Sequence, residues 1–148
     1  IGIGVNTGDV VYGTVGSQER MDSTVLGDNV NVAARLQDLT KDLQARVVIS
    51  EHTLEVVGKG HGLILREVGD VRVRGRREPV HIYEVLNAET EQDKAAKMFT
   101  LSNYRLAYDN YRNGRWREAE ALWQNCLELN PADSVVQYLI AQCQSKVS

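Results

Sequence analysis

The chain has 148 residues, of which 43% are hydrophobic and 25% are charged, which suits one soluble globular domain or two small ones. Its 17 Lys and Arg oppose 20 Asp and Glu, so the net charge is −3 and a nucleic-acid partner is not expected. No apolar run approaches the ~18 residues that a membrane span needs. The start Ile1–Val5 has no charged leader region and is typical of the inside of a strand, so we interpret the chain as part of a longer protein.

The first elements predicted are a hairpin, a strand and a helix. Residues 1–5 and 10–15 alternate apolar and small side chains around a turn at 6–9, which is typical of a β-hairpin. Residues 20–26 indicate a short strand ended by Gly27. Residues 30–39 then predict a helix with one apolar stripe, formed by Val32, Leu36 and Leu39.

Further strands and one capped helix follow. Residues 47–49 predict a short buried strand, and Ser50 is a good N-cap for a helix that runs to about Val57 and ends at Gly58. Three more strands are predicted over residues 63–68, 71–73 and 80–85, the last two separated by a turn at 75–79. Strands and helices in this mixed order favour an α+β fold with an antiparallel end.

A second, helical part begins near residue 88. Of the 12 glycines, 11 lie between Gly2 and Gly75, so the composition changes sharply after that point. We predict one domain over residues 1–87, a linker over 88–94 and a helical tail over 95–148. The tail should contain helices over 95–113, 116–128 and about 134–145, the third capped by Asp133.

One tetratricopeptide-like repeat is predicted in this tail. Its spacing is carried by Gly114, Trp116, Ala119, Trp123, Leu127 and Pro131. A single repeat cannot bury its own apolar face, so it should pack on another part of the protein or be capped by the third helix. We expect Trp123 to be buried between the helices, with Trp116, Leu127 and Tyr138 largely buried as well. The two cysteines, Cys126 and Cys143, occupy apolar helical positions and are expected to be buried, reduced thiols of a cytoplasmic protein.

The stretch from Met21 to Leu36 carries the candidate chemistry. Asn31 and Arg35 are four residues apart on the predicted helix, so their side chains emerge on the same face. An amide beside a guanidinium can hold a sugar oxygen and a phosphate oxygen together, and Thr24 could reach the same pocket. Spacing alone nevertheless favours a plain alternative, in which Asn31 and Arg35 form a solvated pair on a surface helix.

Three segments in order resemble one enzyme family. They are Gly4–Gly16 (GVNTGDVVYGTVG), Met21–Leu36 (MDSTVLGDNVNVAARL) and Val71–Val80 (VRVRGRREPV). Together they are similar to the C-terminal half of the catalytic domain of the class III nucleotidyl cyclases, the adenylate and guanylate cyclases. The resemblance covers residues 1–87 and implies a ferredoxin-like α+β fold, here followed by the all-α helical tail.

The resemblance also implies roles for individual residues. Asn31 would orient the ribose, and Arg35 would stabilise the transition state at the α-phosphate. Thr24 would hydrogen-bond the purine, and because many bacterial adenylate cyclases carry Thr there, it favours ATP over GTP. Arg74 would contact the triphosphate and Arg76 is a second candidate for that role, although a solvated turn explains Arg76 equally well.

The family's cofactor and assembly complete this interpretation. Two Mg²⁺ or Mn²⁺ ions would be held by two aspartates from the N-terminal half of the domain, so this stretch alone should be inactive. The active sites would be shared across a homodimer. The intact protein would be an adenylate cyclase that makes 3′,5′-cyclic AMP and pyrophosphate from ATP in intracellular signalling. It would be tethered to a membrane, with its catalytic end in the cytoplasm.

Two alternatives stay open. The chain could be a non-catalytic, cyclase-like dimerisation module whose helical tail docks a partner protein. A small ferredoxin-like regulatory domain would explain the order of the strands but not the combination of Thr24, Asn31 and Arg35. If the sheet lacks neighbouring strands, we also expect an unpaired sheet edge.

Overall fold

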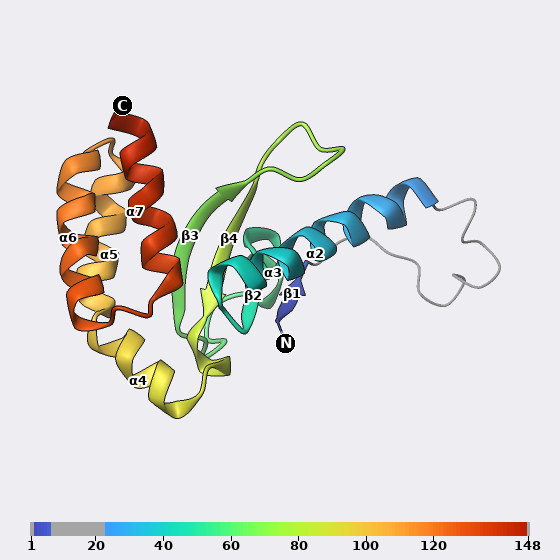
Figure 1. Ribbon diagram of the computed structural model, residues 1–148. Helices are drawn as coiled ribbons and strands as arrows, with labels where there is room; N and C mark the ends of the chain where they lie inside the picture. The colour runs from blue at the N-terminus through green and yellow to red at the C-terminus, as the bar shows by residue number, and fades with distance from the viewer. Residues whose placement is uncertain (1, 7–22, 148) are drawn as a thin grey trace.

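The computed structural model describes the backbone of residues 2–6 and 23–147, and the side chains of residues 2–6 and 31–147. The elements follow in this order: β1 Ile3–Val5, α2 Ser23–Leu43, β2 Val47–Ser50, α3 Glu51–Val57, β3 Leu65–Val71, β4 Val80–Val85, the 3₁₀ turn η1 Leu86–Ala88, α4 Glu91–Phe99, α5 Leu101–Arg112, α6 Trp116–Leu129 and α7 Ser134–Val147. Helix α2 lies across the sheet, α5–α7 stand beside β3, and α4 lies below them (Figure 1). Among the described helices, none is both long and apolar enough to cross a membrane.

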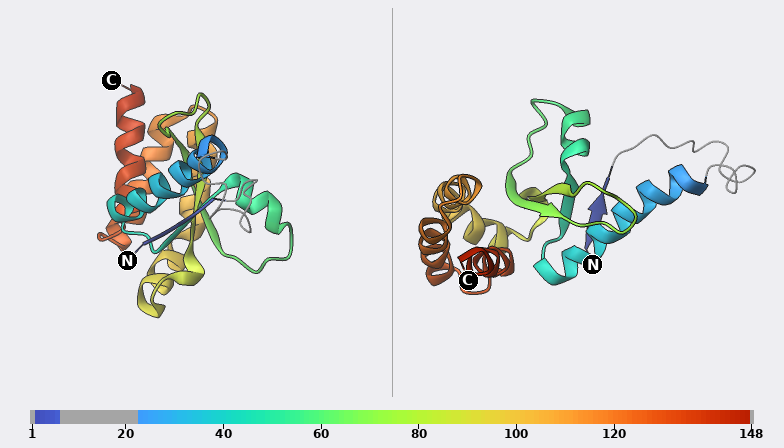
Figure 2. Two further views of the ribbon diagram at one scale, coloured as in Figure 1. Left: turned by 90° about the vertical axis from the view of Figure 1, so that its right-hand side faces the viewer. Right: turned by 90° about the horizontal axis from the view of Figure 1, so that it is seen from above.

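The sheet has four described strands in the order β1-β2-β4-β3. Strands β1 and β2 are parallel, so α2 lies in the crossover connection between them, while β2–β4 and β3–β4 are antiparallel. The predicted mixed α+β class is therefore confirmed. Figure 2 shows the helical tail beside β3, at one edge of the sheet.

Helix α2 is held on the sheet by the predicted apolar stripe. Val32, Leu36 and Leu39 are buried as predicted, and Leu43 continues the stripe by one more turn. Opposite this stripe, one glycine precedes β1 and another, Gly4, lies within it. A Cβ atom at Gly4 would lie 2.4 Å from the Gln37 backbone nitrogen, so only glycine allows β1 and α2 to approach this closely.

The close approach gives a first testable expectation. Gly4→Ala should push α2 away from β1 and lower the free energy of unfolding by about 1–3 kcal/mol, because backbone rather than a flexible side chain meets the new methyl group. Urea or thermal unfolding measures this. An unchanged unfolding midpoint would show that α2 is not seated on β1 in this way.

The start of α2 differs from the sequence-based prediction. Residues 23–26, predicted as the end of a strand, form the first turn of α2, and Gly27 lies inside that helix instead of in a turn. A short apolar run such as Thr24-Val25-Leu26 fits a strand or a helix equally well by periodicity, which is why the pattern misled. The predicted return strand of the hairpin, residues 10–15, lies outside the described residues.

The remaining strands follow the prediction with one correction. Strand β2 and helix α3 lie where predicted, with the Ser50 hydroxyl accepting from the Thr53 backbone N–H and Gly58 ending the helix at φ 71°. The prediction of two separate strands over residues 63–68 and 71–73 is wrong, because a single strand, β3, runs unbroken from Leu65 to Val71. Gly69, at φ 121°, accommodates an irregularity in the pairing with β4 that would otherwise end the strand.

The helical tail contains one more helix than predicted. The predicted helix over 95–113 is divided at Thr100 into α4 and α5, and α4 already begins at Glu91, inside the stretch predicted as a linker. The buried Thr100 hydroxyl donates to the Lys97 carbonyl, which is the local side-chain bonding that interrupts helices. Helices α6 and α7 match their predictions closely, and Asp133 caps α7 through the Val136 N–H.

Aromatic side chains form the centre of the tail. Trp123 is fully buried, as predicted, and its ring meets those of Tyr104, Tyr108 and Tyr111 at centroid distances of 5.6–6.1 Å. Trp116, Leu127 and Tyr138 are only partly buried. Cys126 and Cys143 are buried and unbridged, as predicted. The buried side chains of the tail and those of α2 and the sheet belong to one hydrophobic core.

A buried ion network joins the tail to the sheet. Arg66 of β3 donates from Nε to Glu84 of β4 at 2.7 Å and from its two terminal nitrogens to both carboxylate oxygens of Asp133 at 2.8 and 2.9 Å. Lys97 of α4 donates to Glu84 at 2.5 Å and also to Glu89. All five side chains are buried, and the Arg66 guanidinium lies 4.4 Å from the centre of the Tyr104 ring.

The outer edge of β3 is covered by α5. The Tyr104 hydroxyl donates to the Glu67 carbonyl at 2.5 Å, and Arg105 donates to the Leu65 carbonyl at 3.1 Å. Both carbonyls point away from β4, so side chains of the tail satisfy the edge that a further strand would otherwise use. The predicted unpaired edge is thus not found at β3.

Candidate active site

Helix α2 and the loop between β3 and β4 meet at Arg35. Its Nε donates to the carbonyl oxygen of Arg72, at the start of the loop, at 3.3 Å. Asn31 lies one turn earlier on α2 and is exposed, whereas Arg35 is half-buried. The structure therefore places the two predicted residues on neighbouring turns of one helix, with Arg35 tied to the loop that carries Arg74 and Arg76.

The β3–β4 loop is strongly basic and internally braced. It contains Arg72, Arg74, Arg76 and Arg77 within six residues. The Arg72 side chain donates to the Arg77 carbonyl at 3.0 Å, and the Arg76 N–H donates to the Val73 carbonyl at 3.1 Å. Arg74 is exposed at the loop tip. Guanidinium groups at this density suit a polyanion such as a triphosphate.

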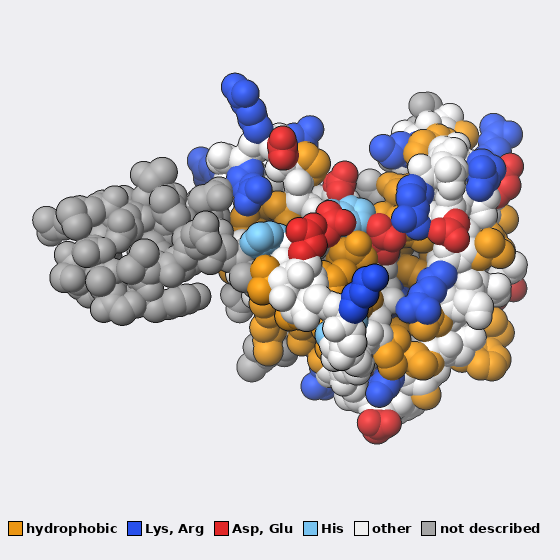
Figure 3. Space-filling model, turned by 180° about the vertical axis from the view of Figure 1, so that it is seen from behind, with side chains coloured by type: hydrophobic (Ala, Val, Ile, Leu, Met, Phe, Trp, Pro, Cys, Tyr) orange, Lys and Arg blue, Asp and Glu red, His pale blue; other side chains and the backbone are white. Residues whose placement is uncertain are grey.

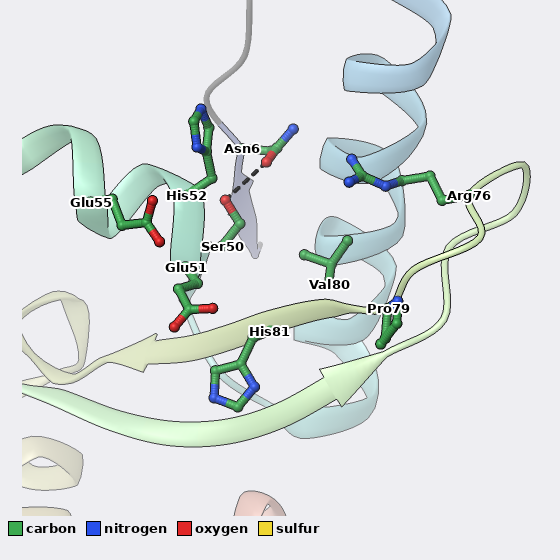
Figure 4. A pocket seen from close by; sticks show the side chains of 9 residues that line it. All are labelled: Asn6, Ser50, Glu51, His52, Glu55, Arg76, Pro79, Val80 and His81. Atoms are coloured by element: carbon green, nitrogen blue, oxygen red, sulfur yellow. Dashed lines mark hydrogen bonds between the residues drawn. The ribbon is translucent and has the colours of Figure 1, made fainter.

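Arg76 points from the loop into a cavity of about 180 Å³. The cavity is lined by Asn6, Ser50, Glu51, His52, Glu55, Arg76, Pro79, Val80 and His81. Figure 4 shows Arg76 reaching across from the loop toward the end of β1, where the Ser50 hydroxyl donates to the Asn6 side-chain oxygen at 2.9 Å. The sequence pattern gave no sign of this cavity, because its lining comes from four separate segments.

His81 at the edge of this cavity is held as a cation. Its Nε2 lies 2.5 Å from a carboxylate oxygen of Glu67 and its Nδ1 lies 2.6 Å from one of Asp70. The hydrogen bond to Glu67 raises the pKa of His81 to about 9, although partial burial lowers it. At neutral pH both ring nitrogens therefore donate, and the charge of the imidazolium is balanced by the two carboxylates that flank it.

A second hollow lies between the sheet and α5 and is already occupied by paired charges. Its volume is about 300 Å³, and tyrosine, arginine and acidic side chains line it. Arg112 pairs with Asp109 at 2.8 Å and lies 3.7 Å from Glu67. Figure 3 shows basic and acidic side chains side by side on the face of the molecule between the two parts. These contacts identify the hollow as part of the interface between tail and sheet.

Two predicted parts of the site, the Thr24 side chain and the metal ions, are not placed by the described residues. The backbone of Thr24 lies in the first turn of α2, but its side chain lies outside the described residues. Within the described ranges, no group of three or more His, Cys, Asp or Glu side chains could hold a metal ion. Arg35 and the four arginines of the loop are cations, which do not fit Mg²⁺ or Mn²⁺.

Comparison with known proteins assigns this arrangement to a family. A profile described as the adenylate and guanylate cyclase catalytic domain matches residues 1–88, more than half of the chain. The chain belongs to this cyclase family. Both α2 and the basic loop, and hence Asn31, Arg35, Arg74 and Arg76, lie inside the matched part.

Known adenylate cyclases are similar to the chain at 38–43% identity. A terminal-differentiation specific adenylate cyclase of Dictyostelium discoideum is 38% identical over 143 residues, 96% of this chain and 7% of the relative. An adenylate cyclase of Anabaena cylindrica is 43% identical over 86 residues, 57% of this chain and 17% of the relative. Adenylate cyclase 1 of Rhizobium meliloti is 38% identical over 84 residues, 56% of this chain and 12% of the relative.

The extents of these matches carry further information. This chain spans less than a fifth of the length of each of the three relatives. The Dictyostelium match is long enough to include the helical tail, whereas the other two have about the length of the cyclase part alone. No solved structure gives a significant match.

Proposed function

We propose that this chain is the C-terminal half of the catalytic domain of an adenylate cyclase, which converts ATP to 3′,5′-cyclic AMP and pyrophosphate in intracellular signalling. The observation that carries the proposal is the contact between Arg35 and the basic β3–β4 loop. This contact brings the Arg35 guanidinium of α2 to the arginines of the loop, with the exposed Asn31 amide one turn away. Guanidinium groups suit the triphosphate of a nucleotide, and the amide suits its ribose. The similarity to adenylate cyclases supports the reaction type.

The proposed reaction is an attack of the ribose 3′-hydroxyl on the α-phosphorus of ATP, with pyrophosphate as the leaving group. Negative charge builds on the phosphoryl oxygens in the transition state, so a guanidinium fixed at that point lowers the barrier. We assign this role to Arg35, because its hydrogen bond to Arg72 limits its movement. Asn31 would orient the ribose, and Arg74 and Arg76 would hold the triphosphate.

The family's metal ions belong to residues outside this stretch. The described residues do not fit Mg²⁺ or Mn²⁺, so no step assigned here passes through a metal. We propose that two aspartates elsewhere in the domain hold the ions, in a homodimer whose subunits share each active site. We accordingly expect the 148-residue chain alone to form no cyclic AMP. We also propose that the full-length protein is tethered to a membrane and that its catalytic end is cytoplasmic.

The helical tail is proposed to be tetratricopeptide-like. The two antiparallel helices α5 and α6, with Trp123 buried between them and Gly114 at their turn, support this. A purely protein-binding role for the tail is the weaker candidate. One face of α5 already covers β3 of the same chain, so that face is not available to an outside partner.

Substrate choice tests the proposed site in the full-length protein. We expect cyclic AMP from ATP and much less cyclic GMP from GTP, since Thr24 is proposed to read the purine. Thr24→Ala should raise KM for ATP and reduce the preference for ATP over GTP. The change in kcat should be smaller, because this residue is proposed to contact the base and not the reacting phosphate. Product formation from each nucleotide with Mg²⁺ or Mn²⁺ measures this. Equal use of both nucleotides by the unaltered enzyme would contradict the assignment of Thr24.

A further inference from the structure

Strand β3 contains one residue more than a regular pairing with β4 allows. Glu67 lies opposite Tyr83, and Gly69 lies opposite the next residue of β4, so two steps along β3 correspond to one step along β4. Such a bulge requires an unusual backbone conformation, which Gly69 provides at φ 121°. The pairing is regular again from Gly69 to Val71, directly before the basic loop.

His81 of β4 spans this bulge. Its Nδ1 lies 2.6 Å from a carboxylate oxygen of Asp70, its partner in the strand register, and its Nε2 lies 2.5 Å from one of Glu67. In a regular strand, residues three positions apart point to opposite faces, so one side chain would not reach both. The bulge brings the two carboxylates to one face, and Figure 4 shows the ring of His81 directed from β4 toward β3. One imidazole thus ties the residue before the bulge to a residue after it.

The backbone on either side of the bulge is bound to other elements. Before it, the Glu67 carbonyl accepts from the Tyr104 hydroxyl of α5 at 2.5 Å. After it, the Arg72 carbonyl accepts from Arg35 of α2 at 3.3 Å. If the bulge moved along β3, the stretch beyond it would shift by one residue, about 3.3 Å. A shift of that size would break the bond between Arg35 and Arg72, because its length is already near the limit for a hydrogen bond.

We propose that His81 is a positioning residue for the nucleotide site. By binding Glu67 and Asp70 across the bulge, it fixes the register of β3. That register determines where the Arg72 carbonyl meets Arg35 and where the arginine loop begins. This inference rests on the proposed adenylate cyclase function and extends it, because it names a residue outside the predicted site on which the geometry of that site depends.

The imidazole must be protonated to donate to both carboxylates, because a neutral imidazole has only one N–H. The hydrogen bond to Glu67 raises the pKa of His81 to about 9, against the effect of burial and with a further contribution from Asp70. The bracing is therefore complete at neutral pH and is lost as the pH rises through about 9. Ionisable side chains of the surrounding elements also face this region: Tyr83 of β4, Glu51, His52 and Glu55 of α3, Arg76 of the loop, and Arg112 of α5.

His81→Phe and His81→Arg in the full-length protein test the proposal. Phenylalanine keeps a ring beside Tyr83 but donates no hydrogen bond, so kcat/KM for ATP should fall about 10- to 100-fold near neutral pH. Arginine can donate to both carboxylates and should keep kcat/KM within about threefold of the original value. Initial rates of cyclic AMP formation at limiting ATP with Mg²⁺ measure this.

The pH profile gives a readout that a purely structural role would not move. In the unaltered protein, kcat/KM should fall as the pH rises through about 9, whereas His81→Arg should lack this fall because a guanidinium stays protonated. Glu67→Gln should move the fall to lower pH, because the bond to Glu67 contributes most to the raised pKa of His81. Asp70→Asn should move it in the same direction by a smaller amount. These profiles decide the question even if His81→Phe folds poorly.

His61→Phe is the matched control. His61 is exposed between α3 and β3, and its Nδ1 accepts from the Leu63 N–H. Its replacement should change neither kcat/KM nor the pH profile. Normal kcat/KM in His81→Phe, or the same alkaline fall in His81→Arg as in the unaltered protein, would overturn the inference and leave the cyclase function intact. If instead the unaltered protein makes no cyclic AMP, or Arg35→Ala turns over normally, the proposed function fails first.

Discussion

Replacing Arg35 with alanine in the full-length protein should lower kcat about 100- to 1,000-fold while KM for ATP changes little. The expected size is that of removing one charged donor from the point where negative charge develops. The effect falls on kcat because the guanidinium interacts most strongly in the transition state, not with bound ATP. Steady-state cyclic AMP formation over a range of ATP concentrations measures both constants.

Lys41→Ala provides the control for this experiment. Lys41 is also a cation of α2, but it is exposed and lies in the last turn of the helix. It should leave both constants near their original values. Near-normal turnover by Arg35→Ala would instead show that Asn31 and Arg35 are the solvated helix pair that their spacing alone suggests.

The second large effect is expected on stability. Arg66→Ala should lower the free energy of unfolding by about 3–5 kcal/mol, because it leaves the buried carboxylate of Asp133 without its ion-pair partner and that of Glu84 with Lys97 alone. Arg112→Ala removes an arginine whose ion pairs are largely exposed and should cost no more than about 1 kcal/mol. Urea unfolding followed by tryptophan fluorescence reports on both, and equal losses would mean that the network does not anchor the tail.

The same network should give the protein an acid-sensitive component of stability. The pKa of Asp133 is lower in the folded protein than in the unfolded chain, so its contribution is present above the unfolded pKa and is lost as the pH falls through the folded one. The stability difference between the unaltered protein and Asp133→Asn should therefore shrink on acidification below the ordinary aspartate range. A difference that is constant with pH would exclude this link.

Local signals in the sequence predicted much of the fold. The Ser50 cap, the Gly58 stop and the stripe along α2 each depend on residues within one or two turns, so pattern and spacing located them. The strand predicted at 23–26 failed because three apolar residues do not distinguish helix from strand. The break at Thr100 was not predicted, because the hydrophobic pattern gives no sign of it; in the structure the buried Thr100 hydroxyl donates to the Lys97 carbonyl there.

Contacts between distant residues could not be predicted in the same way. Arg66 and Asp133 are 67 positions apart, and each taken alone resembles an ordinary solvated charge. For the site, helical spacing placed Asn31 and Arg35 on one face, and the family resemblance supplied their roles. The bond from Arg35 to the Arg72 carbonyl and the cavity around Arg76 depend on how α2, α3 and the loop pack, which no local pattern specifies.

The coverage of β3 by α5 has a consequence for assembly. Hydrogen bonds from Tyr104 and Arg105 occupy the outward carbonyls of Glu67 and Leu65, which disfavours pairing of this margin with a foreign strand. Growth of the four described strands into a wider sheet is therefore directed to the opposite margin, at β1, where Ile3 is exposed. The helical tail thus covers one margin of the four described strands, while the other margin, at β1, has no partner strand among the described residues.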